Sequence, residues 1–482
     1  MPATSKNDLY RALPSVDEVL RSPRLAALVE RVTPQTVAET ARVVLEEVRT
    51  QIASGSLTSE GLEGTISELE STIEQRLWRS LEFSLRAVIN ATGVILHTNL
   101  GRAPLSKAAL DHILGIAGSY SNLEFDLESG ERGRRDVHAQ RLFERLLGRF
   151  PYGEDGRERP QTIVVNNCAA AVMIGLNTLA EGGEVIVSRG ELVEIGGSFR
   201  IPDVMTKSGV TLREVGTTNR TRIEDYERVI HDRTRLLMRV HRSNFSIVGF
   251  TEQPTLRELV TLGRKHRIPV FEDQGNGCLL ELPGSAAGEE SSISGSLRAG
   301  VDVISYSGDK LFGGPQAGLL TGRAELIGQI RTNPIFRALR VDKLTYAALE
   351  ATLLAYLEKG DADLPVRRML TLKAAEVFAR AQRLKETVLR EGSGHTVDLE
   401  IIEGMSLIGG GAAPASTLPT YLVALGMEGL SADQLQKRLR QARPPIIARV
   451  ETGRVLLDLR TVAPEEDAAI AGFLATFCAD AS

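Results

Sequence analysis

The sequence predicts an α/β fold with a mainly parallel sheet, preceded by a helical domain and followed by a smaller α+β domain. Between residues 162 and 321, short runs rich in β-branched residues alternate with segments of helical periodicity, which is typical of strands joined by crossover helices. Before residue 86 the apolar residues recur at helical spacing, and after residue 360 strand-like and helix-like runs are mixed. We therefore expect three domains, at 1–85, 86–360 and 361–482.

The first domain is predicted to be helical. Apolar side chains recur at helical spacing from 37 to 48 and again from 69 to 81. Gly55 and Gly61 lie between these two segments, where we expect a loop. No catalytic constellation is evident in this part of the sequence.

The second domain is predicted to contain the sheet. Its expected strands are 162–165, 184–188, 211–215, 235–241, 269–273, 301–306 and 318–321. Its expected helices are 169–180, 223–231 and 255–266. In such a sheet, chemistry belongs in the loops that follow the carboxyl ends of the strands.

The third domain mixes the two kinds of element. A long helical stretch, Leu370–Arg390, comes first. Strand-like runs follow at 420–425 and 455–459, with helices at 431–441 and 465–479. We therefore expect a separate α+β unit here.

Composition narrows the class of protein. Hydrophobic residues make up 42% and charged residues 25% of the 482 residues, and the net charge is −5. This composition is typical of a globular protein, and the net charge does not indicate nucleic-acid binding. A local basic patch would nevertheless be enough to bind a nucleic acid. The three cysteines, Cys168, Cys278 and Cys478, have no disulfide-like or metal-like spacing. With no secretory or membrane-spanning apolar segment, a cytoplasmic protein is expected.

One lysine stands out at a strand end. The apolar run 301–306 leads into Ser307, Gly308, Asp309 and Lys310, and a Gly-Gly-Pro turn follows. Burial among small residues would lower the pKa of this lysine and make its free amine a nucleophile for an aldehyde cofactor. The alternative is a solvated turn lysine, with glycines present only for their backbone freedom.

Two other strand ends carry groups that complement such a lysine. The run of small residues Asn167, Cys168, Ala169 and Ala170 opens a helix, where free N–H groups and the helix dipole suit a phosphate; ordinary helix capping is the alternative. Asp273 ends another strand and could pair with a protonated pyridine nitrogen, or could simply cap a turn. Together with Lys310 these residues predict a pyridoxal phosphate site.

Arginines form a second group of candidates. Arg102 follows a polar string, and Arg337 and Arg340 lie three residues apart, which predicts one helix face. A guanidinium fork binds two oxygens of an oxyanion at once, whereas the alternative is a solvated basic face.

At these residues the chain closely resembles the bacterial selenocysteine synthase family. The strings that carry the resemblance are VINATGVILHTNLGRAP at 88–104, NLEFDL at 122–127, VSRGELVEIGG at 187–197, VGTTNRT at 215–221, SGDKL at 307–311, GGPQAG at 313–318, RALR at 337–340 and VLLDLR at 455–460. They are long, occur in order and span nearly the whole chain, so the resemblance is specific.

The resemblance implies a fold-type-I enzyme with pyridoxal 5'-phosphate as cofactor. It implies the conversion of seryl-tRNA(Sec) to selenocysteinyl-tRNA(Sec) with selenophosphate as selenium donor, a homo-oligomer built as a decameric ring, and an N-terminal tRNA-binding domain. Carried over by position, Lys310 would bind the cofactor as a Schiff base and Asp273 would face its ring nitrogen. The remaining cofactor-binding residues would be Asn167, Cys168, Ala169, Ala170, His241 and Ser307. Arg102, Arg337 and Arg340 would hold the selenium donor, and no metal is expected.

Two departures from the family pattern are visible. After the fifth strand the family usually carries a Gly-Ser-Gly string, whereas this chain has Gln274, Gly275, Asn276 and Gly277. Cys168 occupies a slot that varies in the family. Neither change removes a required chemical group.

Two other functions fit parts of the pattern. A related pyridoxal phosphate lyase acting on a small amino acid or an amino sugar phosphate would share the lysine region, and the N-terminal domain argues against it. A tRNA-binding scaffold without activity would not be expected to keep Lys310, Asp273 and the arginines.

Overall fold

The computed structural model describes residues 6–479 with internal gaps at 151, 154–155, 157, 196–198, 243, 246, 281–291, 359–360, 392–396, 411–412 and 428. The chain separates into two compact units, Met1–Ala87 and Val88–Ser482. The expected boundary between the second and third domains, at residue 360, lies outside the described residues.

The first unit consists of helices packed around two apolar clusters. Its helices are α1 (Lys6–Ala12), α2 (Val16–Leu20), α3 (Pro23–Val29), α4 (Pro34–Ser54) and α5 (Ser59–Leu81). Val37, Ala41 and Leu45 of α4 pack with Ile73 and Leu77 of α5. The predicted loop is shorter than expected, since α5 already begins at Ser59.

The two glycines near this loop have different places in it. Gly55 caps the end of α4 with a left-handed backbone, φ 78°, a conformation that glycine adopts without strain. Gly61 lies instead in the first turn of α5, and its N–H binds the hydroxyl of the capping residue Thr58.

The second unit is built on a seven-stranded sheet. Its strands are β2 (Gln161–Val165), β3 (Glu184–Ser188), β6 (Thr211–Val215), β7 (Thr234–Val240), β8 (Val270–Gly275), β9 (Val303–Ser307) and β10 (Gly318–Gly322), in the spatial order β2-β10-β9-β8-β7-β3-β6. All neighbours are parallel except that β10 runs antiparallel to both β9 and β2. The mainly parallel sheet is therefore confirmed, with one reversed strand.

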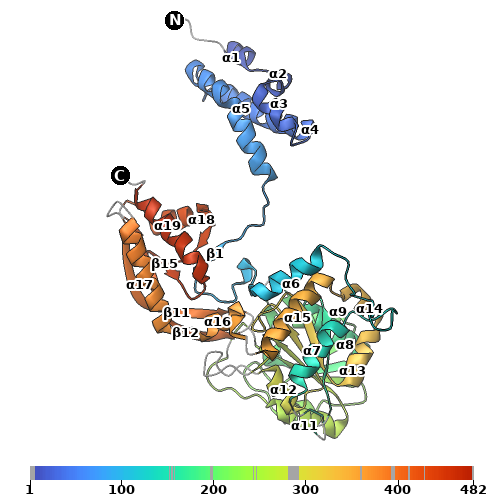
Figure 1. Ribbon diagram of the computed structural model, residues 1–482. Coiled ribbons are helices and arrows are strands. Elements are labelled where there is room, and N and C mark those ends of the chain that lie inside the picture. Colours follow the sequence, from blue (N-terminus) through green and yellow to red (C-terminus); the bar gives the residue numbers. More distant parts are fainter. Residues whose placement is uncertain are drawn as a thin grey trace. The chain divides into compact units, whose positions relative to one another are not determined.

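Helices cover both faces of this sheet (Figure 1). One face packs against α7 (Val137–Leu147), α11 (Leu256–His266), α12 (Ile293–Ala299) and α15 (Lys343–Leu357). The other packs against α8 (Cys168–Ala180), α9 (Ile201–Lys207) and α13 (Ala324–Thr332). Successive residues of a strand point to opposite faces, so Val164 joins the first layer while Ile163 and Val165 join the second.

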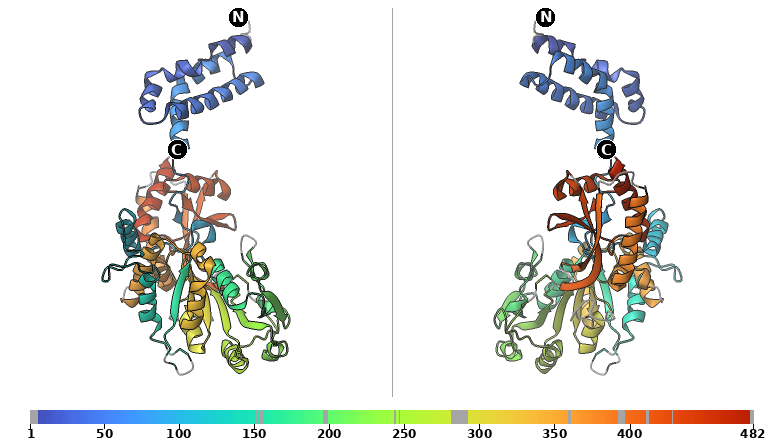
Figure 2. Two further views of the ribbon diagram at one scale, coloured as in Figure 1. Left: turned by 90° about the vertical axis from the view of Figure 1, so that its right-hand side faces the viewer. Right: turned by 90° about the vertical axis from the view of Figure 1, so that its left-hand side faces the viewer.

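The C-terminal part of this unit has its own sheet. Its strands are β11 (Val397–Gly409), β12 (Ala413–Met427), β14 (Arg449–Glu451) and β15 (Arg454–Asp458), all antiparallel, in the order β11-β12-β15-β14. The helices α17 (Ala374–Glu391), α18 (Ala432–Gln441) and α19 (Asp467–Ala479) share one apolar cluster with it. Figure 2 shows these helices, in orange and red, beside the sheet.

The single helix expected at 370–390 is divided into α16 (Pro365–Thr371) and α17. Arg460, fully buried, donates to the carbonyls of Met369 (2.9 Å) and Leu372. These carbonyls are therefore satisfied by a side chain instead of by a continuing helix, and α17 starts afresh with Glu376 accepting from the backbone N–H of Lys373.

A segment before the large sheet runs first along the small sheet. β1 (Ile89–Asn90) pairs with β13 (Ile446–Ile447) in a separate two-stranded sheet. Ile95 and Leu96 then donate their backbone N–H groups to the carbonyls of Leu407 and Ile408 in β11. The chain then reaches Arg102, whose neighbour Ala103 donates its N–H to the carbonyl of Asp309. This segment thus connects the small sheet to the loop that carries Lys310.

Among the residues that the structure describes, no helix combines the length and apolar character needed to cross a bilayer. No group of three or more His, Cys, Asp or Glu side chains in the same ranges could hold a metal ion.

Candidate active site

A cavity of about 260 Å³ opens at the carboxyl ends of β2, β8 and β9. Parallel strands bring these ends together at one edge of the sheet. The cavity is lined by Arg102, Asn167, Cys168, Ala169, Val172, Asp273, Gly275, Ser307, Asp309, Lys310 and Gln316. Most of the residues singled out in the sequence therefore meet in one place.

Lys310 lies on the turn that follows β9 and is 6% exposed. The turn is tied down by backbone hydrogen bonds, from Gly308 to Ala317 (2.9 Å) and from Leu311 to Asn276 (3.0 Å). Burial lowers the pKa of Lys310, because the ammonium loses its hydration. The structure thus gives a buried, poised amine and not a solvated turn lysine.

Asp273 ends in the same cavity, near the end of β8. Its Oδ1 accepts hydrogen bonds from the Ser305 hydroxyl (2.9 Å) and the Cys168 thiol (3.5 Å). Burial raises the pKa of Asp273, while the Ser305 hydrogen bond and the charge of Lys310 act in the opposite direction. A cationic group placed against this carboxylate would offset its desolvation.

The N-terminus of α8 forms the third wall. Asn167 caps the helix through Oδ1, which accepts the backbone N–H of Ala170 at 2.9 Å. Cys168 and Ala169 line the cavity at the first turn, where helix N–H groups and the helix dipole favour an anion. Burial raises the pKa of Cys168, so its thiol stays protonated and can donate to Asp273.

His241 follows β7 and is placed beside this wall of the site. Its backbone N–H donates to the carbonyl of Asp273 at 2.9 Å. The imidazole also acts on the Asp273 carboxylate electrostatically and lowers its pKa. His241 is not among the residues that line the cavity.

Arg102 reaches the cavity from the segment before the sheet. It has a left-handed backbone, φ 62°, its N–H binds the carbonyl of His97 (3.1 Å), and its Nη1 forms an ion pair with Asp309 Oδ2 (2.9 Å). A non-glycine residue in this conformation is strained and persists where the surroundings hold it. Here the ion pair places a guanidinium next to Lys310.

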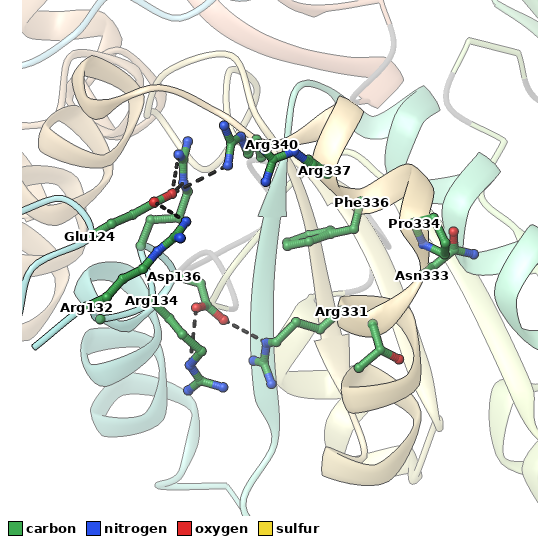
Figure 3. Close-up of a pocket in the computed structure, with 13 residues that line it drawn as sticks. Glu124, Arg132, Arg134, Asp136, Arg331, Asn333, Pro334, Phe336, Arg337 and Arg340 are labelled. Atoms are coloured by element: carbon green, nitrogen blue, oxygen red, sulfur yellow. Dashed lines mark hydrogen bonds and ion pairs between the residues drawn. The ribbon is translucent and has the colours of Figure 1, made fainter.

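Arg337 and Arg340 line a different cavity, of about 530 Å³ (Figure 3). Arg337 belongs to α14 (Pro334–Leu339), but Arg340 lies beyond its end with an extended backbone, ψ 143°. The expectation of a shared helix face is therefore wrong. The helix ends where the Leu339 carbonyl accepts the backbone N–H of Asn166 (3.0 Å), a residue of the turn between β2 and α8.

Comparison with known proteins decides the family. The profile described as L-seryl-tRNA selenium transferase matches residues 88–463, and that described as selenocysteine synthase N terminal matches residues 10–49. The chain belongs to the L-seryl-tRNA selenium transferase family.

Individual relatives match over almost their full length. An L-seryl-tRNA(Sec) selenium transferase of Geobacter metallireducens is 46% identical over 471 residues, 97% of this chain and 99% of the relative. That of Aquifex aeolicus is 44% identical over 460 residues, 95% of this chain and 96% of the relative. The predicted family membership is thereby confirmed.

The fold is shared more widely. The structure of D-glucosaminate-6-phosphate ammonia-lyase superposes with a TM-score of 0.57 at 20% sequence identity, covering 84% of this chain and 98% of that one. This likeness concerns the fold alone, and it confirms the predicted fold-type-I architecture. Pyridoxal phosphate is the cofactor of this family, as the sequence predicted.

The cavity fits that cofactor on its own chemistry. A buried amine for an aldehyde, a helix N-terminus for a phosphate and a buried carboxylate for a pyridinium lie around one space, at Lys310, at Cys168 and Ala169, and at Asp273. The hydrogen bonds that Ser305 and Cys168 donate to Asp273 both reach Oδ1.

Sequence reasoning missed several residues that line this cavity. Asp309 was noted only as a neighbour of Lys310, and Gln316 and Val172 were not considered. Asp309 could have been found as the acid adjacent to the lysine, but its pairing with Arg102 spans 207 positions and leaves no local signal. Asn276, seen as a departure from the family, accepts the backbone N–H groups of Leu311 through its carbonyl and of Cys278 through Oδ1 (2.9 Å).

Proposed function

We propose that this protein converts seryl-tRNA(Sec) to selenocysteinyl-tRNA(Sec), taking selenium from selenophosphate. The observation that carries the proposal is the buried Lys310 in one cavity with Asp273 and the first turn of α8, in a chain that matches this transferase family over nearly its whole length. In the reaction the Cβ–O bond of the seryl group breaks, water leaves, and a Cβ–Se bond forms while the phosphoryl group passes to water as phosphate. The use of aminoacyl-tRNA places the reaction in the cytoplasm.

The residues of the cavity divide the work. Pyridoxal phosphate, when bound, supplies an electron sink for the charge that develops at the seryl Cα. Lys310 Nζ would bind the cofactor aldehyde and, once released from it, would be the base that takes the proton from Cα. Its lowered pKa increases the fraction of free amine available for this. Asp273 would hold a positive charge at the ring nitrogen, and Asn167, Cys168 and Ala169 would hold the phosphate, with Ser307 beside them. Ala170, expected at the same site, does not line the cavity, and its N–H is bound to Asn167 Oδ1. His241 orients Asp273.

Arginines are proposed to hold the selenium donor. Arg102 is in the cavity with Lys310, so its guanidinium can bind an oxyanion close to the reacting carbon. Arg337 and Arg340 line a second cavity. The end of α14, at Leu339, accepts a hydrogen bond from the backbone N–H of Asn166, which directly precedes the proposed phosphate-binding residues. We assign Arg337 and Arg340 to the same anionic donor.

The N-terminal unit is proposed to help bind the tRNA. It forms a separate compact unit and matches the N-terminal profile of selenocysteine synthases. The remaining chain is proposed to divide at residue 360 into a catalytic and a small domain.

We also propose a homo-oligomer, with the decameric ring that the family resemblance implies. Exposed apolar side chains gather on α6 (Lys107–Ala117) and the segment after it, at Leu110, Leu114, Tyr120 and Leu127. Surfaces of this kind mark interaction sites. Light scattering during gel filtration measures the subunit number, and a monomer would contradict the proposal.

A reconstituted reaction tests the function. The full-length protein, loaded with pyridoxal phosphate, is incubated with seryl-tRNA(Sec) and selenophosphate, and the aminoacyl group is identified after ester hydrolysis. Selenocysteine is expected with seryl-tRNA(Sec) and not with seryl-tRNA(Ser). Release of ammonia from an amino sugar phosphate, without selenocysteine formation, would instead indicate a lyase.

A variant tests the lysine assignment independently. Lys310→Ala should lose the visible absorbance of the bound cofactor and the reaction together. A Lys310→Ala protein that keeps the wild-type cofactor spectrum would overturn the assignment of this residue.

A further inference from the structure

Among the described residues, Glu124 is one of the two carboxylates that line the arginine cavity, the cavity of about 530 Å³ that also contains Arg337 and Arg340 (Figure 3). The segment around it folds back on itself, with a bridge between Phe125 and Arg132 and a hydrogen bond from the N–H of Gly133 to the carbonyl of Glu124 (3.1 Å). This fold brings Arg132 and Arg135 to the same carboxylate that also faces Arg340.

Three guanidinium groups from two parts of the chain share this carboxylate. Oε1 accepts both Nε (2.9 Å) and Nη2 of Arg135, and it lies 3.5 Å from Nη1 of Arg340. Oε2 accepts Nη2 of Arg132 at 3.1 Å. These contacts, with the Arg135 hydrogen bond first among them, hold the pKa of Glu124 below its ordinary value, so it stays charged.

Arg135 extends the arrangement to the chain beyond α14. Its Nη1 donates to the carbonyl of Val341 at 2.7 Å, and its side chain is only 17% exposed. Val341 follows Arg340 directly, so the pair of Glu124 and Arg135 holds Arg340 through both its side chain and its backbone.

The pairing pattern leaves one guanidinium available. Asp136 pairs with Arg331 (2.7 Å) and Arg134 (3.7 Å), and Glu124 pairs with Arg132, Arg135 and Arg340. Of the six arginines that line the cavity, Arg337 is the one with no ion pair to a described residue. An incoming anion can therefore accept hydrogen bonds from the guanidinium of Arg337. It can also accept them from the guanidinium of Arg340, whose contact with Glu124 is long, at 3.5 Å.

We propose that Glu124 is a positioning residue, which holds Arg340 beside Arg337 so that the two form a fork for a compact tetrahedral dianion. The inference rests on the proposed function, which assigns the anionic selenium donor to these two arginines. Without a carboxylate between them, Arg132, Arg135 and Arg340 would repel one another and separate. Glu124 therefore lowers the positive potential of the cavity, but it also fixes the direction in which the guanidinium of Arg340 points.

The two effects of Glu124 have opposite signs, and this makes the proposal testable. If charge alone governed the cavity, removing a carboxylate would strengthen anion binding. If positioning governs it, removal weakens binding although the cavity becomes more positive. Glu124→Gln changes charge and geometry together, whereas Glu124→Asp keeps the charge and withdraws the carboxylate by one methylene.

The experiment measures the affinity of inorganic phosphate for the full-length protein by isothermal titration calorimetry, with pyridoxal phosphate bound so that its own phosphate site is filled. Both Glu124→Gln and Glu124→Asp should weaken phosphate binding about tenfold, the loss expected when a charge-assisted contact is misaligned. Glu128→Gln, the same charge change at an exposed position on the same turn, should have no effect. Thermal unfolding of each variant shows whether it is folded during the titration.

Each result decides a different point. Equal or tighter phosphate binding by the folded Glu124 variants would overturn the positioning role. Arg337→Ala serves as the marker of the site, and phosphate affinity that does not change in it would refute the assignment of the anion to this cavity and thus that part of the proposed function. A loss in Arg337→Ala without a loss in either Glu124 variant would refute the positioning role alone.

Discussion

Arg102 and Asp309 form an ion pair of 2.9 Å between the segment that precedes the large sheet and the turn that carries Lys310. The carbonyl of Asp309 also accepts the backbone N–H of Ala103, so the two segments are joined by side chain and backbone together. Because residues 91–96 exchange backbone hydrogen bonds with β11 and β15 of the small sheet, the guanidinium in the cavity is positioned by the small sheet and the large sheet together.

Because Arg102 has a left-handed backbone, we expect its replacement by glycine and by alanine to differ in stability. Arg102→Gly and Arg102→Ala both remove the guanidinium and should both abolish use of the selenium donor. A glycine adopts φ 62° without strain, so Arg102→Gly should be more stable than Arg102→Ala by about 1 kcal/mol. Thermal unfolding of the two variants measures this difference, and equal stability would argue that the backbone relaxes when the ion pair is lost.

Local signals in the sequence were enough for the strand ends and for the three walls of the cavity. Asp273 ends an apolar run, Lys310 lies in the turn after another, and Asn167 precedes a helix of small residues. The periodicity and composition of these segments therefore predicted where the three residues lie in the fold. The reversal of β10 was also within reach, since residues 308–317 are too few for the crossover that a parallel strand needs.

The remaining features depend on contacts between distant parts of the chain. The end of α14 is set by Asn166, the break between α16 and α17 by Arg460, and the conformation of Arg102 by Asp309. None of these partners lies within reach of a local pattern. The separate position of Arg337 and Arg340 follows from the same kind of contact.

Ser305 is predicted to tune the Asp273 carboxylate. Its hydroxyl donates to Oδ1 and lowers the pKa of Asp273, so Ser305→Ala should raise that pKa further. A protonated carboxyl group no longer attracts the pyridinium. As the pH is lowered, the affinity for pyridoxal phosphate should therefore begin to fall at a higher pH than in the wild type. The free energy of pyridoxal phosphate binding should become less favourable by about 1.5 kcal/mol, which is typical of a hydrogen bond to a charged group.

Titrating the bound cofactor by its absorbance at several pH values checks the Ser305 prediction. Cys168→Ser keeps a donor to the same oxygen and serves as the control, with a pH dependence close to that of the wild type. A Ser305→Ala protein with an unchanged pH dependence would show that Asp273 does not face the cofactor ring.

Lys310 should react with an aldehyde at lower pH than an ordinary lysine. Only the free amine reacts, and since burial lowers its pKa from the usual 10.5, the reactive fraction of Lys310 is larger at any pH below that value. When protein without cofactor is treated with pyridoxal phosphate and trapped with borohydride, labelling of Lys310 should reach its plateau at a lower pH than labelling of an ordinary lysine. Labelling of free Nα-acetyl-lysine amide, added as an internal reference, should still be rising at the pH where Lys310 reaches its plateau, and parallel curves would contradict the burial of a neutral amine.

Gly318 should be required by the phosphate-binding wall of the cavity. A Cβ at this position would lie 1.9 Å from the carbonyl oxygen of Asn167, so Gly318→Ala must displace the residue that caps α8. Gly322 at the other end of β10 is equally crowded, since its Cβ would lie 2.1 Å from the carbonyl oxygen of Asp302. Each alanine should destabilise the protein by about 3 kcal/mol, as overpacking against rigid backbone does.

The two glycine variants should differ in cofactor binding, and this separates a local effect from general instability. Asn167 lines the cavity, so Gly318→Ala should weaken pyridoxal phosphate binding even at temperatures where the variant is fully folded. Asp302 is absent from the lining, so Gly322→Ala should bind the cofactor like the wild type under the same conditions. Equal affinity in both variants would place the cofactor phosphate away from the first turn of α8.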